Sequence, residues 1–344
     1  MRTLEYYYKE LIESPDKWNY YEYPSFSYEE FQNGMCQPFI TNYLGKGGKT
    51  ELPVFEYINI IDEKRIWHIV SCFFLGMILY HKIPKLQKYI KKYLTKFPRC
   101  EDNNESDEQR FAYLWMLICL FHDNGYVVEH KKKTVTQSEI EDYLKKFPKN
   151  NGFVPSVFSK ELLQHYNDYI ECKKSHQDHG IICGIEIYSE LCELRKKKEN
   201  VPTSQYWKKD LEQDFAIVSW IIACHNIFFI DENDINLKCY NCKNLKVLIR
   251  KDNDSFPITL KKHPIFLLFC LVDSIEPIKV LDGQNALNDI DCDIEDLKFD
   301  FGKLCSSEGI EYEHKPLSLK KWLTNVTIEE DSGKRIVHIE LNCK

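Results

Sequence analysis

The stretch Ala112-Tyr-Leu-Trp-Met-Leu-Ile-Cys-Leu-Phe-His-Asp-Asn-Gly-Tyr126 is an almost wholly apolar segment that ends on adjacent His122 and Asp123. Ionised carboxylates are rarely buried without a partner, so we expect a polar or charged group to contact His122 and Asp123 inside the fold. Imidazole and carboxylate are both good ligands for divalent metals, and adjacency at a helix end lets both point into one cavity. The stretch therefore predicts a metal site. The alternative is that the pair only caps a helix before the Asn124-Gly125 turn.

Composition bounds the class of protein. A chain of 344 residues with 43% hydrophobic residues can bury a large core, and its net charge of -7 makes nucleic acid an unlikely partner. No charged-then-apolar leader opens the sequence, and the longest apolar run, 66–80, contains His68, which is typical of a core helix and not of a membrane span. We expect a soluble, cytoplasmic protein without a membrane partner, and a homo-oligomer is compatible with this composition. The 14 cysteines are scattered through apolar stretches and are expected to be reduced.

Hydrophobic periodicity predicts a mainly α fold, a helical bundle. Helices are expected at 65–80, 83–97, from the Ser106-x-x-Gln109 capping box to Phe121, at 136–148, 160–173, 176–198, 208–230 and 264–280. We divide the chain into an aromatic-rich N-terminal extension (1–60, a short helix followed by irregular chain), a helical metal-binding domain (61–283) and a small C-terminal α/β appendage (284–344).

The C-terminal region is expected to contain a hairpin about Asp331-Ser-Gly333. Residues 237–260 are expected to form a second hairpin that covers the pocket. Cys239 and Cys242 within it form a lone C-x-x-C, and a zinc knuckle is disfavoured because no second pair accompanies them.

Further candidate ligands lie on apolar segments of other expected helices. They are His68, His179 in Asp178-His179-Gly180, His225 at the end of an apolar stretch, and Asp273 within another. Each alone has an ordinary explanation as a hydrogen-bonded core residue. Together with His122 and Asp123 they are six polar groups on five helices, and burying them would cost several kcal/mol apiece if they did not meet at a common ion. Gly180 and Gly184 share one helix face, which lets a neighbouring helix or a ligand approach closely.

In their order, His68, His122-Asp123, His179, His225 and Asp273 resemble the HD superfamily of metal-dependent phosphohydrolases, in its variant with extra histidines that hold two metals. The resemblance covers about residues 62–273 and rests on R-x-x-H, H-D-x-G, D-H-G, an apolar helix ending H-N, and a late aspartate. His176 competes with its neighbour His179 for one position. Many members carry a lysine after H-D-x-G, whereas this chain has Tyr126.

The resemblance implies two divalent ions, with manganese, iron, cobalt, nickel, magnesium or zinc all compatible. Asp123 would bridge an ion held by His68, His122 and Asp273 to a second one held by His179 and His225, and a metal-bridging hydroxide would attack a small phosphorylated substrate such as a nucleotide. Arg65 and the Lys173-Lys174 pair are candidate phosphate contacts, and Asp178 is a candidate to orient His179. Two other functions remain open. They are a dimetal iron oxygenase on the same ligands, and a ligand-binding or regulatory protein with a structural metal.

Overall fold

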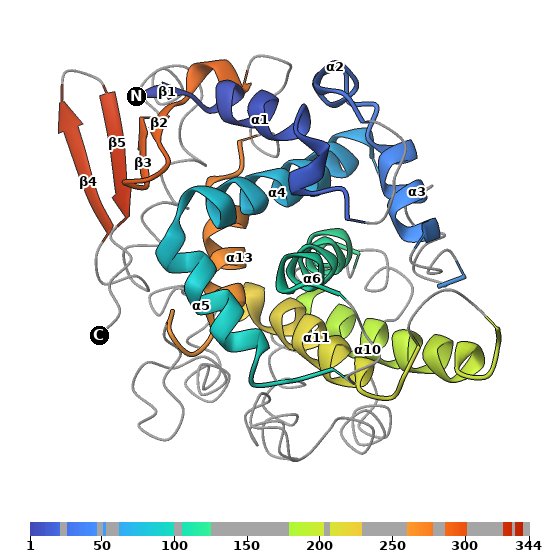
Figure 1. The fold of residues 1–344 in the computed structure, drawn as a ribbon. Helices are drawn as coiled ribbons and strands as arrows, with labels where there is room; N and C mark the ends of the chain where they lie inside the picture. The colour runs from blue at the N-terminus through green and yellow to red at the C-terminus, as the bar shows by residue number, and fades with distance from the viewer. Residues whose placement is uncertain are drawn as a thin grey trace, which may run out of the picture.

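The computed structural model describes residues 1–20, 26–46, 51–52, 62–99, 105–124, 179–202, 207–228, 260–277, 286–300, 326–331 and 334–339. Within these residues the chain is mainly helical with a small sheet at one side (Figure 1), so the expected fold class is confirmed at this level. The elements are β1 (Arg2–Thr3), α1 (Leu4–Ile12), η1 (Pro15–Lys17), α2 (Tyr28–Gln32), α3 (Gln37–Lys46), α4 (Glu63–Lys82), α5 (Pro84–Leu94), α6 (Asp107–Phe121), α10 (His179–Lys198), α11 (Leu211–Phe228), α13 (Pro264–Ile275), η4 (Ala286–Asp289), β2 (Asp291–Asp293), β3 (Lys298–Asp300), β4 (Val326–Asp331) and β5 (Lys334–Ile339).

The central helix α4 ends where proline forbids its continuation. Pro84 has no backbone N–H and disfavours helical backbone in the residue before it, and Ile83 is extended at φ -115° and ψ 93°. The chain therefore turns by 102° into α5. Among the described residues, no single helix is long and apolar enough to cross a bilayer, and the only candidate is this bent α4–α5 pair.

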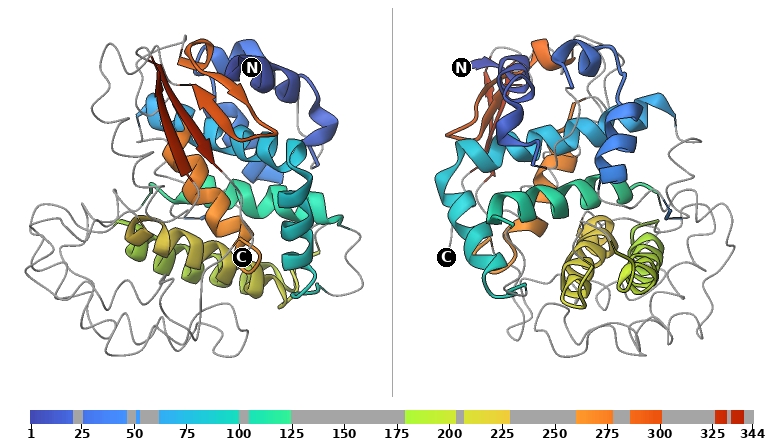
Figure 2. Two further views of the ribbon diagram at one scale, coloured as in Figure 1. Left: turned by 90° about the vertical axis from the view of Figure 1, so that its left-hand side faces the viewer. Right: turned by 45° about the vertical axis from the view of Figure 1, so that its right-hand side comes forward.

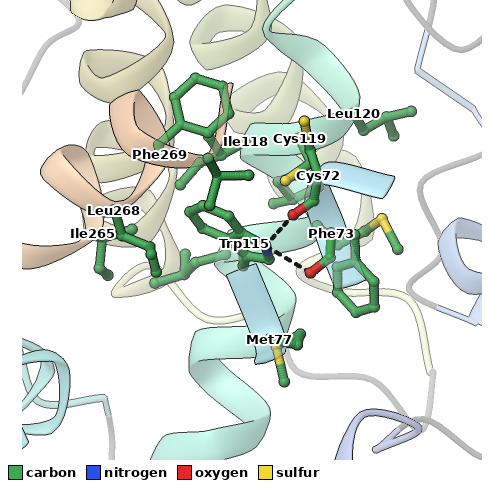
Figure 3. Close-up of a cluster of buried hydrophobic side chains, with 14 of the residues drawn as sticks. Cys72, Phe73, Met77, Trp115, Ile118, Cys119, Leu120, Ile265, Leu268 and Phe269 are labelled. Carbon is green, nitrogen blue, oxygen red and sulfur yellow. Dashed lines mark hydrogen bonds between the residues drawn. The ribbon is translucent and has the colours of Figure 1, made fainter. Parts of the chain in front are cut away.

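Helix α6 packs on α4 through a tryptophan. The Trp115 indole N–H donates to the carbonyl oxygens of Cys72 and Phe73, at 3.2 and 3.0 Å, in the middle of α4 (Figure 3). Gly76 makes room for the ring, because a methyl group at this position would collide with the indole. The expected capping box of Ser106 and Gln109 starts α6. Both helices are thereby fixed relative to each other, which sets the positions of the polar residues at their ends.

Helices α10 and α11 lie side by side below α6, as the end-on view in Figure 2 shows. A Cβ at Gly184 would lie 2.5 Å from the Ser219 carbonyl oxygen and 2.8 Å from the Ala223 Cβ. The Ser219 hydroxyl in turn donates to the Gly184 carbonyl oxygen. The expectation that Gly184 permits a close helix approach is confirmed.

The N-terminal segment contains more helix than its sequence suggested. The prediction of one short helix followed by irregular chain is wrong for 28–46, where α2 and α3 form. Ser27 and Glu30 make a capping box at the start of α2, which is a local signal of a helix. Aromatic side chains from this segment bury themselves against Phe74 of α4, as Trp18 and Phe39 show. The segment therefore forms part of the core.

The small sheet joins the two ends of the chain. Its strand order is β1-β2-β3-β5-β4, with all neighbours antiparallel. The expected C-terminal hairpin is confirmed as β4 and β5, which pair from Val326 with Ile339 to Asp331 with Lys334. The N-terminal strand β1 adds to the other edge, where Arg2 faces Cys292.

A buried ion network holds the opposite ends of the central helices. Asp214 of α11 is fully buried and accepts hydrogen bonds from Arg99 and Arg110, including 2.7 Å from Arg99 Nε and 2.5 Å from one Arg110 terminal nitrogen. Arg110 of α6 also donates to the Leu94 carbonyl oxygen at the end of α5. Arg110 thus links α6 to α11 through the Asp214 carboxylate and to α5 through the Leu94 carbonyl oxygen.

Candidate metal centre

Helix ends from different parts of the chain meet at one buried site. His68 lies near the beginning of α4, His122 directly after α6, His225 near the end of α11, and Asp273 in the last turn of α13. All of these side chains and that of Asp123 are buried, with at most 7% of each residue exposed. The site forms because α4 runs antiparallel to α6 (Figure 2, right), so that His68 in the first turns of α4 lies beside His122 after the end of α6. Asp273 in the last turn of α13 meets both histidines.

The ligand atoms of this cluster are spaced as ligands of one ion. His68 Nε2 is 3.5 Å from Asp273 Oδ1, His122 Nε2 is 3.7 Å from the same oxygen, and His122 Nε2 is 3.5 Å from Asp123 Oδ1. These distances exceed those of hydrogen bonds. Two tetrahedral ligands that each lie about 2.1 Å from a metal are about 3.4 Å apart. The structure therefore brings together residues that could hold a metal ion, and the ligand atoms of His68, His122 and Asp123 form one such group.

The histidines are oriented by hydrogen bonds at their other ring nitrogens. His122 Nδ1 lies 2.8 Å from the Cys119 carbonyl oxygen, and His225 Nδ1 lies 2.6 Å from the Ile222 carbonyl oxygen. A carbonyl oxygen only accepts, so each Nδ1 carries the proton and each Nε2 presents a lone pair. Imidazoles held in this way are typical of metal ligands.

Two residues that the sequence analysis did not single out belong to this site. Glu276 lies with one carboxylate oxygen 2.5 Å from His68 Nδ1, so that the proton on this nitrogen leaves Nε2 to face Asp273. Cys72 Sγ lies 3.6 Å from His68 Nδ1, and Cys72, His68 and Asp273 form a second group that could hold a metal ion. Helical spacing could have found Cys72, because it is four residues after His68 on the same helix.

His225 lies next to this cluster, beside the ring of His122. Its ring centroid is 5.5 Å from that of His122, and Phe269 packs against both rings at 5.0 and 5.7 Å. His225 is itself buried, with 1% of the residue exposed.

The N-terminal part of α10 lies beside the end of α6, next to the cluster. The Cys183 thiol donates to the Phe121 carbonyl oxygen at 2.7 Å, and Phe121 is the residue before His122. Because α10 and α11 pack antiparallel with Gly184 beside Ala223, the backbone of His179 begins α10 on the side of His225. The His179 side chain, Asp178, His176, Lys173 and Lys174 lie outside the described residues, as do Tyr126, Cys239 and Cys242.

Arg65 is the cation at the rim of the site. Its side chain is 45% exposed, and one of its terminal nitrogens lies 3.9 Å from Asp123 Oδ2. The guanidinium thus reaches from solvent to the buried carboxylate. An exposed, delocalised cation in this position can form bidentate hydrogen bonds with a phosphate.

Charge and donor chemistry at the site both favour a divalent cation. Asp123, Asp273 and Glu276 bring three buried carboxylates to the site, and Arg65 lies beside Asp123. The C-terminal ends of α6, α11 and α13 add negative partial charge. Imidazole nitrogen with carboxylate oxygen suits manganese, iron, cobalt, nickel and zinc.

The neighbouring thiols are neutral packing groups. Burial raises the pKa of Cys119 well above its usual value, and the charge of Asp273 adds to this effect. The pKa of Cys270 is raised for the same two reasons. Among the described residues every cysteine is buried and free of disulfides, in agreement with the expectation of reduced core cysteines.

Comparison with known proteins gives no relative for this chain. No family model, no curated protein and no solved structure matches it. The geometry of the cluster is therefore the basis for a functional assignment.

Proposed function

We propose that this chain is a metal-dependent phosphohydrolase of the HD type that acts on a nucleotide or another small phosphoester. The observation that carries the proposal is the convergence of His68, His122, Asp123 and Asp273 at distances suited to one ion, beside the exposed guanidinium of Arg65. Bound divalent ions would supply an activated water and polarise a phosphoryl oxygen. The order of these residues along the chain is that of the HD resemblance.

We assign different roles in metal and phosphate binding to different residues of the site. His68, His122 and Asp273 would hold one ion, and Asp123 lies where its second carboxylate oxygen faces Arg65. His225, next to His122, and His179 at the start of α10 are the proposed ligands of a second ion. Arg65 would bind the phosphate of the substrate at the exposed side of the site, which orients the phosphorus atom for in-line attack.

The test is metal analysis of anaerobically purified full-length protein, together with a phosphate-release screen over nucleotides and cyclic dinucleotides. We expect turnover with manganese, iron, cobalt or nickel, and its loss with a chelator. Asp123→Ala should lose metal and activity together. Asp300→Asn is the matched control, because this carboxylate is also buried but lies in β3, outside the cluster. Undiminished hydrolysis after thorough metal removal, or no phosphoester turnover by the metal-loaded protein, would refute the proposal.

The number of ions is tested by stoichiometry beside kinetics. If His179 and His225 hold a second ion, replacing either with alanine should leave about one equivalent of metal while the rate falls by orders of magnitude. A wild-type count of one ion at saturating metal contradicts the dinuclear arrangement. The two histidines would then contact the substrate, and KM would carry more of the loss in the variants.

A further inference from the structure

A buried chain of hydrogen bonds leads from the N-terminal helix to the proposed metal ligand His68. The Tyr8 hydroxyl of α1 lies 2.7 Å from Ser71 Oγ, and Ser71 Oγ donates to Glu276 Oε1 at 2.6 Å. The other oxygen of Glu276 lies 2.5 Å from His68 Nδ1. Each of these four residues is at most 1% exposed. Elements that are far apart in the sequence, α1, α4 and α13, thus contribute to one polar path.

The chemistry of the groups fixes the direction of every bond in this path. Ser71 Oγ donates to Oε1 of Glu276, and with the carboxylate as the acceptor at both oxygens, His68 Nδ1–H donates to Oε2. Ser71 has then used its only proton, and its oxygen can only accept from the Tyr8 hydroxyl. The path therefore reads from Tyr8 to Ser71 to Glu276, with His68 donating from the opposite side. With the proton on Nδ1, the lone pair of His68 is on Nε2, the nitrogen that faces Asp273.

Tyr8 has a specific effect on Ser71. A serine within a helix commonly turns its hydroxyl back to the carbonyl oxygen four residues earlier. The Tyr8 hydroxyl lies within hydrogen-bonding distance of both Ser71 Oγ and the Ser71 carbonyl oxygen, the latter at 3.0 Å. A proton donated to Oγ favours the rotamer in which the serine proton faces Glu276. Without it, Ser71 can return to the helix backbone, and Glu276 loses a donor.

We propose that Tyr8 is a positioning residue of the metal site, which acts through Ser71 and Glu276 to hold His68 as an Nε2 ligand. This inference rests on the proposed metal binding at His68 and adds a role for the N-terminal helix. Partners of metal-bound histidines fix ring orientation and raise ligand basicity, and their loss lowers metal affinity by about 10–100-fold. Tyr8 is two hydrogen bonds beyond Glu276, the direct partner of His68, so its effect is smaller.

The test compares Tyr8→Phe with Tyr28→Phe in the full-length protein. Tyr28 is the matched control, since it also packs on Phe31 and donates one hydrogen bond, 3.0 Å to Glu5, outside the path. Cobalt(II) affinity is measured by competition with a chelator, with the cobalt absorption spectrum as the signature of the ligand set. We expect Glu276→Ala to weaken binding by about 10–100-fold and Tyr8→Phe by about threefold or more, whereas Tyr28→Phe should match the wild type.

A second measurement needs no metal. Nitrogen-15 NMR of the apo-protein reports which ring nitrogen of His68 carries the proton. We expect an Nδ1–H form in the wild type and in Tyr28→Phe, a mixture in Glu276→Ala, and a shifted Nδ1–H signal in Tyr8→Phe. If wild-type protein takes up no cobalt, the proposed function fails while the NMR result still decides the path. If cobalt binds but Tyr8→Phe equals Tyr28→Phe in affinity, the inference is overturned. Ser71→Ala replaces Tyr8→Phe should that variant fail to fold.

Discussion

Replacing Gly184 with alanine should destabilise the protein, although the same change in an exposed helix would stabilise it. In an open helix, alanine is favoured over glycine by about 0.8–1.0 kcal/mol. At Gly184 the new Cβ would lie 2.5 Å from the Ser219 carbonyl oxygen, whereas ordinary contacts begin near 3.4 Å. The two helices must therefore separate by about 0.9 Å, the difference between these distances. The obstacle is backbone, so no side-chain rotation relieves it.

The expected cost follows from these competing effects. Overpacking of this kind costs about 1–3 kcal/mol. Separation of α10 from α11 also weakens the bond from the Ser219 hydroxyl to the Gly184 carbonyl oxygen, which adds about 1 kcal/mol. After subtraction of the helix preference for alanine, the free energy of unfolding should fall by about 1–3 kcal/mol.

The assay is urea denaturation followed by circular dichroism. Ser219→Ala serves as the control, because it removes the same hydrogen bond without adding a methyl group, and it should cost about 1 kcal/mol. Ala223→Gly in the Gly184→Ala background should recover part of the loss, since it removes the contact at 2.8 Å. A Gly184→Ala protein that is as stable as the wild type, or more stable, would refute the packing argument.

Two further predictions concern buried charge. Asp214→Ala leaves Arg99 and Arg110 without their shared carboxylate, so we expect the free energy of unfolding in urea denaturation to fall by about 3–5 kcal/mol. Lys82→Ala, at an ion pair with Glu10 in which each side chain is 33% exposed, should lower it by less than about 1 kcal/mol. Burial, reinforced by nearby lysines, lowers the pKa of His263 from 6.5 to about 4. The unfolded chain therefore binds this proton first, and stability should fall by about 2–3 kcal/mol as the pH drops from about 6.5 to 4. His263→Phe should flatten that pH dependence, and an unchanged profile would contradict it.

The sequence predicted the helices that carry the site because their apolar periodicity is strong. Helices at 65–80, 106–121, 208–230 and 264–280 were expected, and α4, α6, α11 and α13 occupy those places with shifted ends. Polar residues inside such apolar runs stand out, which is why His68, His122 and Asp273 could be found. The helices expected at 136–148 and 160–173, and the hairpin at 237–260, lie outside the described residues.

The residues that were missed depend on contacts between distant elements. Glu276 follows the last turn of α13 and has no local feature that distinguishes it from a surface glutamate, yet it is buried because His68 and Ser71 meet it. Tyr8 was one of three consecutive tyrosines in the sequence, and only its place against Ser71 separates it from Tyr6 and Tyr7. Tertiary partners of this kind cannot be derived from periodicity.

The division of the chain into segments 1–60, 61–283 and 284–344 stays a prediction. The small sheet is relevant to it, because the sheet contains strands from the first and the last of these segments. Strand β1 pairs with β2, and the Leu4 amide donates to the Ile290 carbonyl oxygen at 2.8 Å, so α1 begins on the C-terminal sheet. Tyr8 lies one helical turn after Leu4 on the same face of α1. The sheet therefore fixes the start of α1, and one turn later the Tyr8 hydroxyl contacts Ser71. On the proposed path, the geometry at His68 depends on residues near both ends of the chain, through contacts that a helical domain cut at residues 61 and 283 would lack.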